Sequence, residues 1–267
     1  MPLIEVVDVA KSFASRHGSI SIMADIGFDV QDNDFLAIVG PSGCGKSTLL
    51  RLIQGLDRPS SGEVRFRGSV VDRVQPDMTM VFQNFALYPW LTIRENVAMG
   101  LEARHAPQER IDTQVERYIS VTGLVGFEEA YPRELSGGMR QRVGLARALA
   151  VEPSVLLMDE PFSALDPLTA EGLRDEVLQL WQDPGLPPDA VVLVTHNIEE
   201  ALLMADRVIV LSRRPSRVLA GVPVKLPRPR DRKSPAFYEL TDYVYSLITE
   251  GRQPIPGGPP KADGEPP

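Results

Sequence analysis

Short apolar runs alternate with amphipathic stretches along most of this chain of 267 residues. Brief runs that are apolar throughout are typical of strands buried on both faces of a parallel sheet. A polar stretch, residues 11–19, predicts a loop between the first two such runs. The predicted strands are residues 4–9, 21–30, 35–39, 63–66, 78–82, 155–159, 190–194, 207–212 and 217–222.

Apolar residues recur at helical spacing in several of the segments between these strands. A helix over residues 92–101 is predicted by a capping box, in which Glu95 stands three residues after Thr92. Since residues 108–122 continue the helical pattern, this mid-chain block is interpreted as an insertion between two strands. Further helices are predicted over residues 46–54, 137–150, a stretch after 166, 197–205 and an amphipathic stretch around 237–248.

Composition narrows the class of protein. The net charge of −8 disfavours a nucleic acid as the main partner. Cys44 is the single cysteine, which excludes an intrachain disulfide and fits a reducing compartment. No apolar run approaches the length of a membrane span, and the first residues do not resemble a signal peptide. We therefore expect a soluble, cytoplasmic protein.

A glycine-rich stretch follows the predicted strand 35–39 and precedes the predicted helix 46–54. It fits the phosphate-binding pattern G-x-x-x-x-G-K-[ST]. Its backbone N–H groups would wrap a phosphate chain, with Lys46 reaching the β- and γ-phosphates and the Ser47 hydroxyl ligating Mg²⁺. The stretch, called the P-loop below, consists of Gly40, Pro41, Ser42, Gly43, Cys44, Gly45, Lys46, Ser47 and Thr48.

Two acids end the predicted strand 155–159, at the edge of the sheet where α/β proteins bind ligands. Asp159 would hold Mg²⁺ through its water shell, and Glu160 would take a proton from the attacking water. His196 ends another predicted strand and is assigned to the γ-phosphate. Phe13 leaves two interpretations open, core packing or stacking on a purine ring.

Two further segments each leave two interpretations open. Residues 85–91 are rich in aromatic side chains but too irregular for a strand, so they either dock a partner or pack on the helical block. Lysine and arginine residues recur over residues 225–233, where a solvated linker is the default and contact with anionic lipid headgroups is the alternative. Residues 252–267 are rich in proline and glycine, which is typical of disorder.

Taken in order, these motifs resemble the nucleotide-binding subunit of an ABC transporter. Walker A is 40–48, the Q-loop glutamine is Gln83, the signature is 135–139, Walker B is 155–159, the D-loop is 163–166 and the switch histidine is His196. Residues 88–92, 158–162 and 195–201, with Met139, are similar to the nitrate, sulfonate, taurine and bicarbonate importer class.

The resemblance implies a fold and its division into domains. The expected fold is an α/β P-loop NTPase core with an antiparallel β subdomain and an inserted α-helical subdomain. The core would comprise residues 1–83 and 154–222, and the helical subdomain residues 84–153. A C-terminal extension with an amphipathic helix would cover residues 223–250, and a disordered tail residues 251–267.

The resemblance also implies a mechanism that uses ATP and Mg²⁺. Two copies would pair as a homodimer, so that each ATP lies between the P-loop of one copy and Ser136, Gly137 and Gly138 of the other. Ser47, Gln83 and Asp159 would organise the Mg²⁺, and Asp166 would lie at the shared site. Glu160, His196, Gln83 and Lys46 are the expected catalytic residues.

The expected assembly is peripheral, on the cytoplasmic face of the cell membrane. It would hold two integral-membrane permease subunits, receive its solute indirectly from an extracytoplasmic solute-binding protein, and bind no nucleic acid. The alternative is a soluble ABC-type ATPase not coupled to transport. Solute identity cannot be deduced from this chain, because the solute contacts other subunits.

Overall fold

The computed structural model describes residues 1–15, 18–183, 185 and 188–250. Within these residues, a six-stranded sheet has the order β10-β9-β3-β8-β7-β6. Neighbouring strands run parallel, except that β10 is antiparallel to β9. The strands are β3 (Phe35–Val39), β6 (Met78–Val81), β7 (Val155–Asp159), β8 (Ala190–Thr195), β9 (Arg207–Leu211) and β10 (Val218–Pro223).

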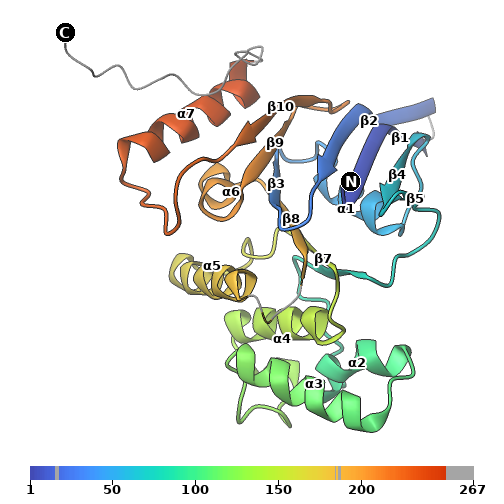
Figure 1. Cartoon of the computed structure of the whole chain (residues 1–267), viewed down its shortest axis with the longest axis vertical. Helices are drawn as coiled ribbons and strands as arrows, with labels where there is room; N and C mark the ends of the chain where they lie inside the picture. The colour runs from blue at the N-terminus through green and yellow to red at the C-terminus, as the bar shows by residue number, and fades with distance from the viewer. Residues whose placement is uncertain (16–17, 184, 186–187, 251–267) are drawn as a thin grey trace.

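A second sheet of four antiparallel strands lies beside the first in the described chain, with the order β2-β1-β4-β5 (Figure 1). Its strands are β1 (Ile4–Ser15), β2 (Gly18–Val30), β4 (Ser61–Phe66) and the short β5 (Ser69–Val70). The loop predicted over residues 11–19 is wrong, because β1 and β2 continue pairing as far as Ser15 and Gly18. Antiparallel strands tolerate polar residues on a solvated face, so polarity alone does not indicate a loop here.

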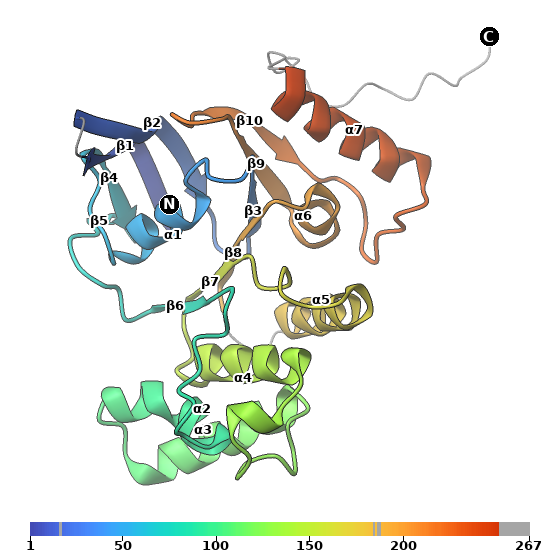
Figure 2. The same ribbon diagram turned by 180° about the vertical axis from the view of Figure 1, so that it is seen from behind.

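The helices cover the six-stranded sheet and extend beyond one end of it. Figures 1 and 2 show α2, α3 and α4 gathered at that end, where α4 packs on both α5 and β6. The predicted helices are confirmed to within a few residues, including the capping box at Thr92. They are α1 (Lys46–Gln54), α2 (Ile93–Ala103), α3 (Gln108–Val121), α4 (Gly137–Ala150), α5 (Pro167–Gln182), α6 (Ile198–Met204) and α7 (Pro235–Glu250).

The apolar strands of the six-stranded sheet separate two hydrophobic cores. In β3, Leu36 and Ile38 pack toward α1 and the antiparallel sheet, while Phe35, Ala37 and Val39 pack toward the other helices. Burial on both faces explains why these strands are apolar at every position. The carboxyl ends of β3, β7 and β8 are adjacent, so the residues that follow them meet at one edge of the sheet.

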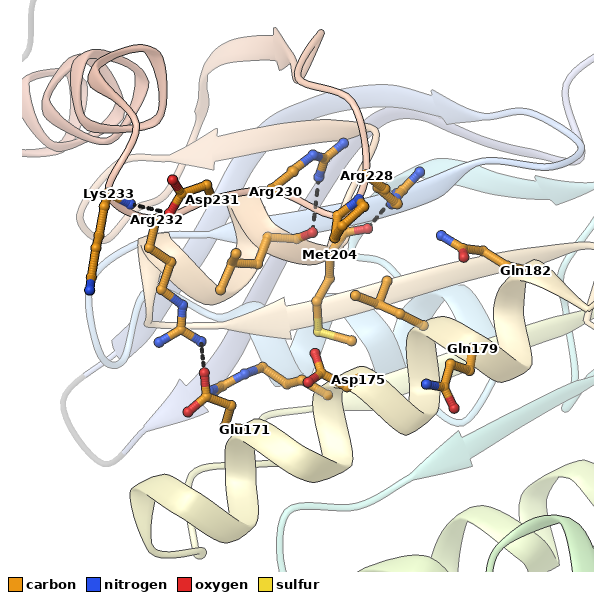
Figure 3. A pocket seen from close by; sticks show the side chains of 14 residues that line it. Glu171, Asp175, Gln179, Gln182, Met204, Arg228, Arg230, Asp231, Arg232 and Lys233 are labelled. Atoms are coloured by element: carbon orange, nitrogen blue, oxygen red, sulfur yellow. Dashed lines mark hydrogen bonds and ion pairs between the residues drawn. The ribbon is translucent and has the colours of Figure 1, made fainter.

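The C-terminal segment folds back onto α6, where it corrects one prediction. The Arg230 side chain is only 1% exposed and donates hydrogen bonds to the carbonyls of Leu202, Leu203 and Ala205 (Figure 3). Arg228 caps the same helix end through the carbonyl of Met204. A solvated linker is therefore wrong for these two arginines, because the last carbonyls of α6 have no partner inside the helix and require donors.

Helix α7 follows this segment and packs on α6, β9 and β10. Its predicted apolar face is confirmed, since Phe237, Leu240, Val244 and Leu247 are buried. In the described part of the chain, no helix is both long enough and apolar enough to cross a membrane. The predicted tail, residues 251–267, lies outside the described residues.

Candidate functional site

The P-loop connects β3 to α1 in a conformation that its glycines make possible. Gly43 and Gly45 have φ angles of 76° and 108°, in the left-handed region that disfavours other residues. A Cβ atom added to Gly45 would lie 2.6 Å from the Cγ2 atom of Ile22. Helix α1 begins at Lys46, so its unpaired N–H groups face the same loop. This geometry provides the backbone donors and the helix N-terminus that bind a phosphate chain.

Lys46 directs its charge into this loop. Its side chain is 4% exposed, and its amine donates to the carbonyls of Gly40 at 3.1 Å and Pro41 at 3.4 Å. The same amine lies 3.7 Å from the Oε1 atom of Glu160. Lys46, after β3, and Glu160, after β7, therefore place one cation and one carboxylate at a common point.

Ser47 and Asp159 form a second link between the same strand ends, as their Oγ and Oδ1 atoms are 2.8 Å apart. Burial raises the pKa of Asp159, as does the charge of Glu160, while the hydrogen bond from Ser47 opposes the shift. A divalent cation beside this carboxylate would favour its ionised form and so oppose the rise in the pKa of Asp159. No group of three or more acidic, histidine or cysteine side chains that could hold a metal occurs in the described residues.

Glu160 has a strained backbone that turns its side chain toward the P-loop. Its φ angle is 46°, in the left-handed region, where a non-glycine residue is uncommon. The conformation is held by hydrogen bonds from its N–H to the Val194 carbonyl at 2.9 Å and to its carbonyl from the Ser163 hydroxyl at 2.9 Å. Its Oε2 atom lies 3.0 Å from Nδ1 of His196. Such strain is characteristic of functional sites.

Ser136 and Asp166 act as helix caps in this structure. Ser136 caps α4 by accepting a hydrogen bond from the Met139 N–H at 3.2 Å. Asp166 caps α5 through the Thr169 N–H at 3.1 Å, and these hydrogen bonds to Thr169 lower the pKa of Asp166. A Cβ atom on Gly138 would lie 2.5 Å from Thr169 Cγ2, so the two helix starts pack closely. The Ser136 cap satisfies one of the N–H groups at the start of α4, and Ser136 itself is exposed.

Several predicted site residues are not joined to the P-loop within the described chain. No hydrogen bond or ion pair there connects it to Gln83, to Asp166 or to the segment from Ser136 to Gly138. Gln83 is exposed directly after β6. Phe13 lies on β1, is 43% exposed and has the Lys11 amine 4.9 Å from its ring centroid. Core packing is therefore wrong for Phe13, and the stacking interpretation remains a prediction.

Two arginines in this region were missed by sequence reasoning. Arg214 donates to the Gly43 carbonyl through Nε at 3.1 Å and through Nη2 at 2.6 Å. Arg147 of α4 donates to the carbonyls of Phe85 and Ala86, both of which have positive φ angles. Neither arginine belongs to a local motif, so only the folded chain reveals these contacts.

Comparisons with known proteins agree with this geometry. The sequence profile of the ABC transporter family matches residues 23–163. The nitrate import ATP-binding protein of Synechocystis sp. is 42% identical over 94% of this chain and 96% of its own length. The bicarbonate transport ATP-binding protein of Synechococcus elongatus is 38% identical, covering 92% of this chain and 90% of that protein. The aliphatic sulfonates import ATP-binding protein of Bacillus cereus is 37% identical, covering 93% of this chain and 96% of that protein.

Solved structures show the same architecture. A dimeric ATP-binding cassette in a post-hydrolysis state with ADP and Pi has a TM-score of 0.73 and 31% identity, covering 83% of this chain and 99% of that one. The cbiO1 protein of Clostridium perfringens, at 23% identity, has a TM-score of 0.74 and shows the fold alone.

The fold and the site define an α/β P-loop ATPase, and the chain belongs to the ABC transporter family. Within that family it is an ATP-binding and ATP-hydrolysing subunit of an ABC importer, which excludes the soluble alternative.

Proposed function

We propose that this subunit energises the import of a small solute such as nitrate, a sulfonate, taurine, bicarbonate or a similar compound. The relatives named for nitrate, sulfonate and bicarbonate transport support this solute class. Solute-stimulated ATPase activity of the assembly in proteoliposomes, tested with each compound in turn, would identify the solute. Stimulation by none of them would contradict the proposed class.

The geometry at the strand ends supports the catalytic roles that we propose here. The P-loop N–H groups and Lys46 bind the β- and γ-phosphates, and Ser47, Gln83 and Asp159 would hold Mg²⁺. When bound, Mg²⁺ neutralises phosphate charge. Glu160 accepts the proton of the attacking water, and His196 orients the Glu160 carboxylate and donates to the γ-phosphate.

The observation that supports these roles best is the convergence of Lys46, Glu160 and His196 from three adjacent strands. Glu160→Gln keeps the shape of the side chain but cannot accept a proton, so hydrolysis should fall by about 10²–10⁴-fold. Binding of a fluorescent ATP analogue should stay near the wild-type level. Hydrolysis at the wild-type rate would refute the assignment of Glu160 as the base.

Two copies would complete the site head to tail. The start of α4, Ser136 to Gly138, makes no hydrogen bond with the P-loop of its own chain in the described residues. Lys46→Ala and Ser136→Arg should each inactivate a homodimer. A heterodimer carrying one change in each copy should recover one intact site, and no recovery in verified heterodimers would favour a self-contained site.

The permease subunits would dock beside Gln83. A groove of about 510 Å³ is lined there by Phe82, Ala86, Tyr88 and Arg147, among others. Trp90 is 69% exposed, with its ring centroid 5.5 Å from that of Tyr88. Exposed aromatic side chains beside a groove are typical anchors for a partner protein. Because Arg147 holds the turn after Gln83, pressure on this groove would reach both Gln83 and α4.

The remaining expectations depend on this assembly. We assign residues 1–83 and 154–222 to the nucleotide-binding core, 84–153 to a helical subdomain and 223–250 to a C-terminal extension. Through the permeases, the ATPase subunits would lie on the cytoplasmic face of the membrane and respond indirectly to an extracytoplasmic solute-binding protein.

A further inference from the structure

A buried ion pair near His196 joins Arg174, which lies outside the sequence motifs, to Glu200, which lies in the segment 195–201. Arg174 of α5 and Glu200 of α6 are joined by Nη1 and Oε2 atoms 3.5 Å apart. Their side chains are 11% and 6% exposed. A buried ion pair loses much of its Coulombic gain to desolvation, so it is weak evidence for a purely stabilising role.

Glu200 is connected to both neighbours of His196. The Asn197 side chain caps α6 by accepting from the Glu200 N–H at 3.1 Å. The Asn197 N–H donates to Thr195 Oγ1 at 3.0 Å. Burial raises the pKa of Glu200, and its interactions with Thr195 and Arg174 oppose that shift. The backbone on either side of His196 is therefore fixed relative to Glu200.

Arg174 reaches the segment that carries Glu160. Its guanidinium carbon lies 6.0 Å from the ring centroid of Phe162, which is 3% exposed and follows Glu160 by two residues. Arg174 also lines a cavity of about 300 Å³ together with His196. One side chain on a rigid helix thus contacts the loop after β7 and, through Glu200, the loop after β8.

We propose that Arg174 is a positioning residue that holds Glu160 and His196 at their 3.0 Å separation. Its planar guanidinium pairs with the Glu200 carboxylate while lying over the Phe162 ring, so neither loop shifts independently. This inference rests on the roles proposed above for Glu160 and His196. A displacement of about 1 Å at a reacting group is enough to slow catalysis about 100-fold.

The test compares full-length Arg174→Met with the wild-type chain. We expect kcat for ATP hydrolysis to fall about 10- to 100-fold, while KM for ATP changes less than about 2-fold because the P-loop is untouched. Arg174→Lys keeps the charge but not the planar fork and should recover only part of kcat. Arg117→Met is the matched control, since Arg117 also pairs with a glutamate, Glu152, and lies over an aromatic ring, far from Glu160.

A second variant separates positioning from loss of folding. In Arg174→Met/Glu200→Gln neither partner is left as an unpaired buried charge, so the fold should persist while kcat stays low. The chain has three histidines, and a His196→Gln variant assigns the ¹³C signals of the His196 ring among them. These signals should move in Arg174→Met and in Arg174→Met/Glu200→Gln, and not in Arg117→Met.

Unchanged kcat and unmoved His196 signals in folded Arg174→Met would overturn the inference. A parallel measurement of Glu160→Gln keeps the two proposals distinct. If Glu160→Gln is inactive while Arg174→Met keeps the wild-type kcat, the base assignment stands and the positioning role falls. If Glu160→Gln hydrolyses ATP normally, the catalytic roles themselves fall.

Discussion

The left-handed backbone of Glu160 predicts an inverted order of stability for two substitutions. Glycine is normally worse than alanine by about 0.5–1 kcal/mol, because it loses more backbone entropy on folding. At a φ angle of 46°, however, a residue with a Cβ atom carries strain of about 1–2 kcal/mol that glycine avoids. Glu160→Gly should therefore be as stable as Glu160→Ala or up to about 1.5 kcal/mol more stable.

Both variants lose the same contacts with Lys46 and His196. The difference between their free energies of unfolding therefore reports the backbone strain at this position. Glu176, in the interior of α5, is the matched control because its backbone is helical. There the free energy of unfolding of the alanine variant should exceed that of the glycine variant by about 1 kcal/mol. Urea titrations without nucleotide give the free energies of unfolding, and thermal midpoints should differ by about 2–4 °C per kcal/mol.

The refuting result is the same order at both positions. If Glu160→Ala were more stable than Glu160→Gly by the margin measured at Glu176, the backbone of Glu160 would not be strained in solution. Hydrolysis should fall by about 10²–10⁴-fold in both Glu160 variants, because the base is lost. A stabilised but inactive Glu160→Gly protein would indicate that the strain is retained for the sake of catalysis.

Trp90→Ala should leave the melting temperature and basal ATPase activity nearly unchanged. It should weaken co-purification with the permease, because truncating an anchor residue costs about 2 kcal/mol or more of binding free energy. A lower melting temperature with normal assembly would make Trp90 a core residue. Arg230→Met should destabilise the chain by about 2–4 kcal/mol in urea titrations, because buried carbonyls lose their donors. Arg232 is partly exposed, so Arg232→Met should change stability by less than about 0.5 kcal/mol. Equal effects of the two substitutions would contradict the capping role of Arg230. Arg214→Met should weaken binding of a fluorescent ATP analogue several-fold by freeing a P-loop carbonyl, while Arg213→Met, at the exposed neighbouring position, should not; equal affinities would show that the loop needs no support from Arg214.

The strands, the helices and the P-loop could be predicted because their signals are local. Gly43 and Gly45 meet a backbone requirement within the loop itself, and a run of apolar residues such as β3 follows from burial on both faces. The order of the motifs was sufficient to predict the family, because six such motifs in one order make a specific pattern.

The strand pairing of residues 11–15 with residues 18–23 was missed because side-chain polarity does not reveal the backbone hydrogen bonds that pair them. Phe13 could not be placed from its neighbours alone, since exposure depends on which strand lies beside it. The basic stretch was misread at Arg228 and Arg230 for a related reason, namely that the carbonyls they bind belong to α6.

The sequence by itself determined the class of fold, the nucleotide loop and the identity of the candidate catalytic residues. Only the tertiary structure decided that Glu160 is strained, that Arg214 supports the P-loop and that Arg174 joins the loops carrying Glu160 and His196. The physical reason is distance along the chain. A glycine turn or a helix cap is satisfied within a few residues, whereas these arginines bind groups contributed by other elements, whose proximity exists only once the sheet has brought the strand ends together.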